Sequence, residues 1–163
     1  MKKLLFTLAL LLPMMLSAQK IGHINTQELF AAMPEVARVR AQMDTIQSQY
    51  ETTLLSMQEE FQRKYQDYQQ NAATMPDAVK SIREQELQEM QQRIQTFLQT
   101  AEQDIQKKQQ ELLVPVHEKM TKAIQTVGAK QGFTYVFDSA AMVYIAPDAT
   151  NLMSEVKKEL KIQ

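Results

Sequence analysis

A stripe of apolar residues at three- and four-residue spacing runs through an otherwise polar sequence from Pro34 to Gln70. Its members are Val36, Val39, Met43, Ile46, Tyr50, Leu54, Met57, Phe61, Tyr65 and Tyr68. This spacing places them along one side of an α-helix for about five heptads, as in coiled coils. Such a helix is roughly 55 Å long. Because its other faces are almost entirely polar, it can bury only this stripe, and the stripe requires a partner helix.

A second stripe of the same kind follows a short segment of turn-forming residues. The segment is NAATMPD, residues 71–77, which contains Asn, Thr and Pro. The second stripe comprises Val79, Ile82, Leu87, Met90, Ile94, Phe97, Ala101, Ile105 and Leu112. Two stripes of similar length on either side of a short turn favour an antiparallel helical hairpin. Since such a hairpin has a thin core, its tip near Met75 is expected to fray.

Pro115 interrupts the second stripe. A proline inside a helix costs about 3 kcal/mol unless the helix bends or restarts there, so the arm is predicted to end at this residue. The sequence leaves open whether Pro115 is a hinge or a fixed kink. Beyond it, apolar residues from Val116 to Val127 continue a helix that Gly128 or Gly132 is expected to terminate.

Short strand-like segments lie at the two ends of the chain. Residues 21–24 alternate as a strand, followed by a helical turn that Asn25 or Thr26 caps. Residues 133–138 and 142–145 are predicted as two further strands. A last helix is expected to begin at residues 147–150, with three apolar residues on one face: Leu152, Val156 and Leu160. If the terminal strands pair, they join the bases of both arms in a small body, which assembly with other copies would help to stabilise.

The first eighteen residues have the features of a secretory signal peptide. Lys2 and Lys3 precede the apolar run Leu4–Leu12, and small residues before Gln19 predict cleavage near Ala18. The run is shorter than the roughly 18–20 residues needed to span a bilayer. The chain has no Cys, which excludes a lipoprotein anchor and disulfides. The sequence therefore predicts an exported protein that is soluble outside the cytoplasm.

The residues give little support to catalysis, cofactor binding or nucleic-acid binding. Without Lys2 and Lys3 the chain carries 16 basic and 19 acidic residues, so it has no overall basic charge for nucleic acid. The two histidines, His23 and His117, are isolated from one another and form no zinc motif. We therefore predict no enzyme activity, no metal and no cofactor. His23 is interpreted as structural, with pH sensing as the alternative.

Residues near the predicted tip are the candidates for contacts with a binding partner. Most aromatic and Met residues of the stripes are interpreted as core of the hairpin, but Met75 lies in the turn and has no position in a stripe. Met is flexible and polarizable, which suits varied partners. The candidate partner-binding residues are Tyr65, Tyr68, Met75, Arg63, Lys64, Lys80 and Arg83. For the basic residues, ordinary solvated charge is the favoured interpretation and a partner or lipid contact is the alternative, because nearby glutamates dilute a positive tip.

The order of these segments resembles the Skp (OmpH-like) family of periplasmic chaperones over essentially the whole chain after residue 18. The segments that carry the resemblance are KIGHINTQELF, the Gln- and Glu-rich hairpin, GAKQGFTYVFD and APDATNLMSEVKKEL. In that family a strand ends in Asp and a D-x-T motif caps the final helix; Asp138 and residues 148–150 occupy those places.

The resemblance implies a mostly α, α+β fold: a long antiparallel helical hairpin (a coiled-coil tentacle) on a small β body. Three chains would form a jellyfish-like homotrimer around a cavity. Residues 19–163 would be a single domain, with a body at 19–33 and 116–163, an arm at 34–115 and a tip at 71–77.

The resemblance also implies a function, that of an ATP-independent holdase. Family members bind unfolded outer-membrane β-barrel proteins and prevent their aggregation on the way to the outer membrane. The best-known members are basic, whereas this chain is slightly acidic, so any contact with membrane or lipopolysaccharide would be weak. The alternative is a structural coiled-coil scaffold of the cell envelope, against which the turn and the closing strands argue. A dedicated lipid carrier would need an apolar pocket, which the sequence lacks.

Overall fold

The computed structural model describes residues 19–162, which form two compact units. The hairpin unit comprises Phe30–Thr121. The sheet unit comprises the residues up to Leu29 together with Lys122–Lys161. The predicted signal peptide, residues 1–18, lies outside the described residues. None of the helices within residues 19–162 has an apolar stretch long enough to cross a bilayer.

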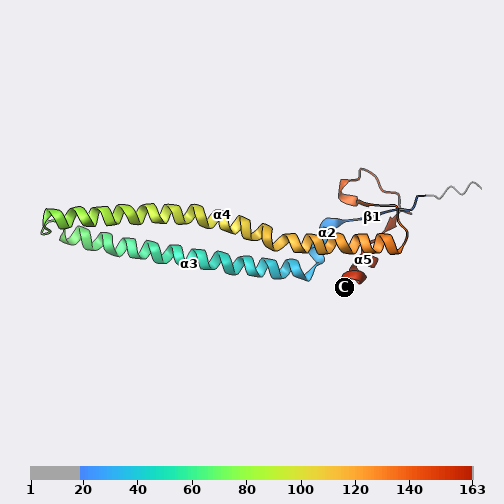
Figure 1. Cartoon of the computed structure of the whole chain (residues 1–163), viewed down its shortest axis with the longest axis horizontal. Helices are drawn as coiled ribbons and strands as arrows, with labels where there is room; N and C mark the ends of the chain where they lie inside the picture. The colour runs from blue at the N-terminus through green and yellow to red at the C-terminus, as the bar shows by residue number, and fades with distance from the viewer. Residues whose placement is uncertain (1–18, 163) are drawn as a thin grey trace, which may run out of the picture. The chain divides into compact units, whose positions relative to one another are not determined.

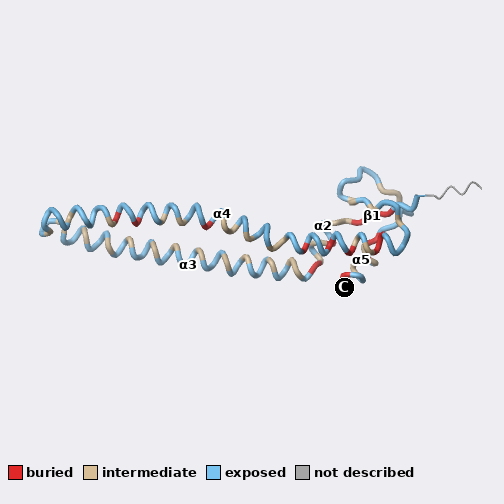
Figure 2. Tube along the Cα trace, in the orientation of Figure 1, coloured by how far each residue is buried: buried red, intermediate tan, exposed pale blue. Residues whose placement is uncertain are grey.

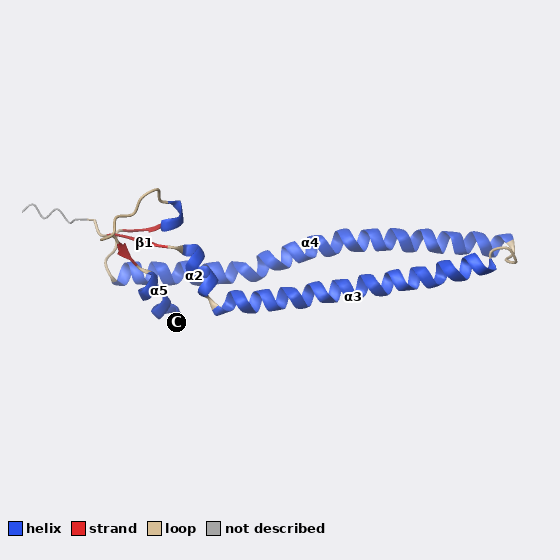
Figure 3. Cartoon of the chain, turned by 180° about the vertical axis from the view of Figure 1, so that it is seen from behind, coloured by secondary structure: helices blue, strands red, loops and turns tan. Residues whose placement is uncertain are grey.

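Two long helices make up most of the hairpin unit. Helix α3 spans Pro34–Asn71 and begins with its proline in the first turn, where the missing N–H is harmless. Helix α4 spans Asp77–Lys130. The two helices lie side by side and are joined at one end by a short turn (Figures 1 and 3). The predicted antiparallel hairpin with a turn between residues 71 and 77 is confirmed.

The core of the hairpin is thin, as a narrow apolar stripe requires. No residue of α3 is fully buried. In the arm part of α4 the buried residues are Leu87, Met90 and Ala101. Figure 2 shows intermediate and exposed residues along almost the whole length of both helices. Few apolar side chains are therefore withdrawn from water per residue of hairpin, and the tertiary stabilisation of each helical turn is small.

The sequence left open whether the helix bends or restarts at Pro115, and in the structure α4 continues through this residue as one helix to Lys130. Figure 1 shows α4 curving as its colour passes from yellow to orange, without a break. Pro115 is exposed, and so is Glu111, whose carbonyl loses its helical N–H donor to the proline ring. Water can hydrate that carbonyl, so the helix accommodates Pro115 by bending and does not end at this residue.

The sheet unit contains a three-stranded parallel sheet in the order β2-β1-β3. The strands are β1, Ile21–Ile24, β2, Tyr135–Asp138, and β3, Thr150–Asn151. Strand β1 pairs with β2 over four positions, from Ile21↔Tyr135 to Ile24↔Asp138. The predicted pairing of the two ends of the chain is therefore confirmed, and its direction is parallel.

Two short helices complete the fold of the described residues. Helix α2 spans Thr26–Ala32 and helix α5 spans Met153–Leu160. Fully buried core residues of the sheet unit are Ile24, Leu29, Leu152 and Val156. The predicted apolar face of the last helix is confirmed, because Leu152, Val156 and Leu160 are all buried. Helix α4 ends just before Gly132, which has a positive φ of 71° that favours glycine.

The prediction of a strand at Met142–Ile145 is wrong. Strand β2 is followed by a short 3-10 helix, η2, at Ser139–Ala141, because the Asp138 carboxylate accepts a hydrogen bond from the backbone N–H of Ala140. The apolar residues that follow lie at the surface, and the second edge of β1 is taken by β3. The last helix also begins later than predicted, at Met153, whose N–H bonds the Asn151 side chain.

Candidate functional site

The turn at the tip of the hairpin is held by hydrogen bonds to three backbone carbonyls. Asn71 C=O accepts from the N–H groups of Thr74 and Met75 at 3.0 and 3.1 Å. Pro76 C=O accepts from the N–H groups of Val79 and Lys80. Tyr68 C=O accepts from Ala72 N–H at 2.8 Å. Met75 is half-buried in this turn, so part of its side chain contacts the protein and part faces solvent.

Two of the four basic candidates near the tip converge on one glutamate. Lys64 Nζ lies 3.9 Å from Glu86 Oε2, and Arg83 Nη1 lies 2.8 Å from the same oxygen. The hydrogen bond from Arg83 and its charge, and then the charge of Lys64, lower the pKa of the Glu86 carboxyl. Within residues 19–162 neither Arg63 nor Lys80 makes an ion pair. Because Lys64 Nζ also lies 3.9 Å from Glu60 Oε1, the tip is a locally neutralised network with two further cations beside it.

The two candidate tyrosines have different surroundings. Tyr65 is 40% exposed, stacks on Phe61 with ring centroids 6.0 Å apart, and accepts a hydrogen bond from Gln69 Nε2. Tyr68 is half-buried, and its hydroxyl donates across the hairpin to Glu84. This hydrogen bond raises the pKa of the Tyr68 hydroxyl. Tyr68 thus helps to join the two helices, whereas Tyr65 presents an aromatic surface.

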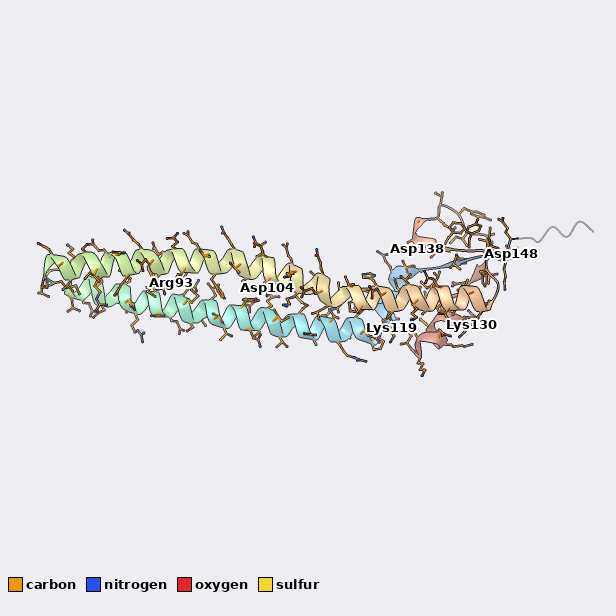
Figure 4. The ribbon with its side chains drawn as sticks, viewed as in Figure 1. Arg93, Asp104, Lys119, Lys130, Asp138 and Asp148 are labelled. Atoms are coloured by element: carbon orange, nitrogen blue, oxygen red, sulfur yellow. The ribbon has the colours of Figure 1, made fainter. Side chains whose placement is uncertain are left out.

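A second tyrosine–carboxylate pair joins the helices farther from the tip. Tyr50 Oη donates to Asp104 Oδ2 at 2.5 Å, and the Tyr50 ring lies 5.8 Å from that of Phe97. Figure 4 shows Asp104 on the side of α4 that faces α3. The hydrogen bond to Asp104, followed by burial, raises the pKa of Tyr50.

Three grooves along the arm were not predicted from the sequence. One, of about 490 Å³, has an apolar floor of Tyr50, Leu54, Phe97, Leu98, Ala101 and Ile105. A second, of about 600 Å³, is lined by Leu55, Phe61 and Ile94 with polar residues around them. A third, of about 610 Å³, is lined by Met57, Phe97, Arg93, Glu89 and uncharged polar residues. Each groove is an apolar strip with a polar rim.

The sequence did carry a signal for these grooves. Leu55 directly follows the stripe residue Leu54, and Leu98 directly follows Phe97. An apolar residue beside the stripe cannot face the partner helix as fully as its neighbour does. Leu55 and Leu98 remain 56% and 47% exposed. Doubled apolar positions in a heptad pattern therefore indicate apolar surface beside the seam.

The sheet unit exposes a second apolar surface, on the face of the sheet opposite Gly22 and Ile24. Ile21, Tyr135 and Phe137 are 51%, 51% and 43% exposed. The Tyr135 and Phe137 rings stack with centroids 6.0 Å apart. In the following loop Val143 and Tyr144 are more exposed still. Strand β2 is also an edge strand, which natural proteins usually cover.

Asp138, the last residue of β2, has a structural role. Its Oδ2 accepts from the Thr26 hydroxyl, and its Oδ1 accepts from the N–H groups of Thr26 at 3.4 Å and Ala140 at 3.0 Å. The Thr26 hydroxyl is the main cause of a lowered Asp138 pKa. One carboxylate thus joins the start of α2, the end of β2 and η2.

The two histidines belong to different units, and within residues 19–162 neither belongs to a cluster of metal-binding side chains. His23 is in β1 of the sheet unit, and its buried Nδ1 has no hydrogen-bond partner among residues 19–162. His117 is in the hairpin unit and stacks on Phe30 at 4.6 Å. Within the described part of the chain no three His, Cys, Asp or Glu side chains gather as metal ligands would. Among residues 19–162 the arrangement consists of exposed apolar surfaces and grooves rather than a cluster of metal ligands.

Comparison with known proteins agrees with this architecture. The chain is 28% identical over 145 residues to Chaperone protein Skp of Pectobacterium atrosepticum, covering 89% of this chain and 87% of that protein. It is 27% identical over 146 residues to Chaperone protein Skp of Vibrio cholerae serotype O1, covering 89% and 85%. Among solved structures, an OmpH-like protein of Caulobacter crescentus CB15 shares the fold, with a TM-score of 0.76 at 17% identity over 87% of this chain and 83% of that one.

The family itself is identified by the match along the sequence. Residues 20–160 match the family model described as Outer membrane protein (OmpH-like), so the match covers the hairpin, all three strands and the last helix. The resemblance drawn from the sequence motifs is thereby confirmed, together with the predicted fold class. The chain belongs to the OmpH-like family.

Proposed function

We propose that this chain is an ATP-independent holdase chaperone of the periplasm, which binds unfolded outer-membrane β-barrel proteins and prevents their aggregation. The observation that carries the proposal is the hairpin, which leaves open apolar grooves with polar rims along a scarcely buried arm. A holdase must bind many unfolded chains weakly and release them without fuel. Several small apolar strips separated by polar side chains suit this requirement better than one large apolar patch. The relatives named Chaperone protein Skp support the same conclusion.

Assembly into a homotrimer is part of the proposal. The exposed aromatic face of the sheet, formed by Tyr135 and Phe137 with Ile21, is apolar surface that a monomer would leave in water. Other copies of the chain would cover it, with the residues at 19–33 and 116–163 forming the body and those at 34–115 the arm. Enclosure between three arms would keep one client apart from the next. Export through a signal peptide cleaved near Ala18 completes the proposal.

Contacts near the tip are proposed to help in holding the client. Tyr65 offers an exposed ring, and Met75 a partly exposed flexible side chain. Arg63 and Lys80 are cations that pair with no glutamate in residues 19–162. Lys64 and Arg83, in contrast, form ion pairs with Glu86. Tyr68 contributes mainly by keeping the two helices together. With an overall acidic charge, contact with membrane or lipopolysaccharide would be weak. No catalytic step, cofactor or nucleic acid is needed.

A light-scattering experiment tests the function. A urea-unfolded outer-membrane β-barrel protein is diluted into buffer with the chain lacking residues 1–18 and without nucleotide. We expect scattering to fall to near the buffer level at about three chains per client, because each client is enclosed before it meets another. Undiminished aggregation at both low and moderate salt would favour the alternative, a structural scaffold of the cell envelope.

A variant at the tip serves as the control for specific holding. Met75→Asp places a charge on the proposed contact surface and should weaken the suppression of aggregation while leaving thermal unfolding nearly unchanged. Ala73→Asp puts the same charge on an exposed residue of the same turn and should have little effect. Equal losses of suppression from both variants would show that charge at the tip, and not the Met75 side chain, is what matters.

A further inference from the structure

The groove of about 490 Å³ in the arm differs from the other two grooves in its charge. Its charged lining residues are Glu51 on α3 and Glu102 on α4, and no Lys or Arg lines it. The groove of about 600 Å³ contains Glu59 and Arg63, and the groove of about 610 Å³ contains Glu89 and Arg93. Two grooves are thus balanced in charge, and one carries two net negative charges.

The neighbouring charged groups do not neutralise Glu51 and Glu102. Lys107 and Lys108 follow on α4, but both pair with Glu111, at 3.8 and 3.2 Å. Asp104 is itself acidic, and its carboxylate accepts a hydrogen bond from the Tyr50 hydroxyl. Within residues 19–162 neither Glu51 nor Glu102 has an ion-pair partner. Gln47 Nε2 donates to Glu51 Oε1 at 3.0 Å and holds that carboxylate at the rim.

The floor and the rim of this groove suit an extended polypeptide. The floor is apolar, and its Leu98 is 47% exposed. The remaining rim residues are glutamines, Gln47, Gln99 and Gln106. A glutamine amide has both donors and an acceptor, so it can satisfy the unpaired N–H and C=O groups of an unfolded backbone. In an extended chain alternate side chains point to the same side, so apolar residues can lie on the floor while flanking residues reach the rim.

We propose that the groove bounded by Glu51 and Glu102 is a binding site for extended segments in which apolar side chains are flanked by Lys or Arg. The apolar side chains of the segment lie on Leu54, Leu98 and Ile105. One Lys or Arg of the segment pairs with Glu51 on α3, and another pairs with Glu102 on α4. This proposal rests on the proposed holdase function and deepens it. The site would let the arm select segments of an unfolded client by their charge. The other two grooves, which are balanced in charge, would not select segments in this way.

Fluorescence anisotropy with short synthetic peptides tests the site in the whole chain after residue 18. The first peptide contains Leu and Phe separated by Lys and Ser, and the second has Glu in place of every Lys. At low salt we expect the basic peptide to bind about tenfold more tightly, the combined effect of two exposed ion pairs. Charge reversal by E51K/E102K should abolish or invert this preference, and Leu98→Ser should weaken the binding of both peptides.

A matched control separates the groove from the overall charge of the protein. D44K/E118K makes the same change in net charge at two exposed residues of α3 and α4 outside the groove. It should leave the preference for the basic peptide intact. Equal effects of the two double variants would overturn the proposal. The proposal would also be overturned if the E51K/E102K protein kept its preference for the basic peptide but changed its sedimentation. That result would mean that a second copy of the chain, and not a client segment, occupies the groove.

The outcome distinguishes the groove from the chaperone function. Suppressed aggregation of a β-barrel client with no charge preference among peptides would overturn the groove and leave the holdase function standing. Charge-selective peptide binding without suppression of aggregation would support the groove and contradict the holdase function.

Discussion

Replacing Gly22 by Ala is expected to destabilise the sheet unit by about 3 kcal/mol, and replacing it by Val to destabilise it further. A Cβ atom at this position would overlap Leu152 Cδ1 and would lie 2.8 Å from Phe133 Cε1. Leu152 is fully buried, so it has no space into which to withdraw. Urea denaturation followed by circular dichroism, at equal chain concentration, measures the loss.

Gly128 provides the matched control for this substitution. It is also buried, but a Cβ there would meet only Val136 Cγ2, at an ordinary 3.5 Å. Because Gly128 lies inside α4, Gly128→Ala should be neutral or stabilise the protein by about 0.5–1 kcal/mol through helix propensity. Equal stability of the Gly22→Ala and Gly128→Ala variants would contradict the close packing of β1 against Leu152.

Asp138→Ala is expected to cost about 2–3 kcal/mol near neutral pH, since it removes charge-assisted hydrogen bonds and leaves the Thr26 hydroxyl without its partner. The pKa of the Asp138 carboxyl is lowered from 3.8, chiefly by the Thr26 hydroxyl. Its contribution is therefore complete above pH 3.8 and is lost as the pH falls through the lower folded-state pKa. The stability difference between wild type and variant should shrink in that acidic range.

Urea midpoints at neutral and acidic pH measure this effect, with Asp138→Asn as the control. Asn keeps one acceptor oxygen for Thr26 and Ala140 but carries no charge, so its loss at neutral pH should be smaller than that of Ala. A stability difference that stays constant from neutral pH to well below pH 3.8 would contradict a role for the ionised carboxylate.

The hairpin was predictable because its cause is local. The stripes repeat at helical spacing for many turns, and the turn at residues 71–77 contains the residue types that end a helix. The buried Leu152, Val156 and Leu160 were predictable for the same reason. Pairing of the N-terminal strand with residues 135–138 also followed, because two short apolar segments need one another to form a sheet.

The errors arose where distant contacts decide the structure. Residues 142–145 have strand propensity, yet Asp138 caps η2 and turns the chain, and Thr150–Asn151 occupies the free edge of β1. Strand propensity alone cannot show which segment pairs with the edge of a given strand. At Pro115 the sequence could not show whether the helix bends or restarts. Glu111 is exposed, so water can bond to its carbonyl, and the helix continues.

Of the candidate site, the sequence listed residues near the tip, but it could not show how those residues pair with one another. It placed Lys64 and Arg83 among the partner contacts, whereas both lie against Glu86. That pairing joins residues from two helices and depends on how the hairpin is aligned. The grooves beside Leu55 and Leu98 were missed because neither leucine was assigned to a stripe and most stripe residues were interpreted as core.

Sedimentation equilibrium, with and without a urea-unfolded outer-membrane β-barrel protein, tests the central claim most directly. For the chain after residue 18 alone we expect the mass of three copies. On dilution of the client into the same buffer without nucleotide, the mass should rise by that of one client. A chain that sediments as a stable monomer, or a trimer whose mass does not change while the client aggregates, would contradict the claim.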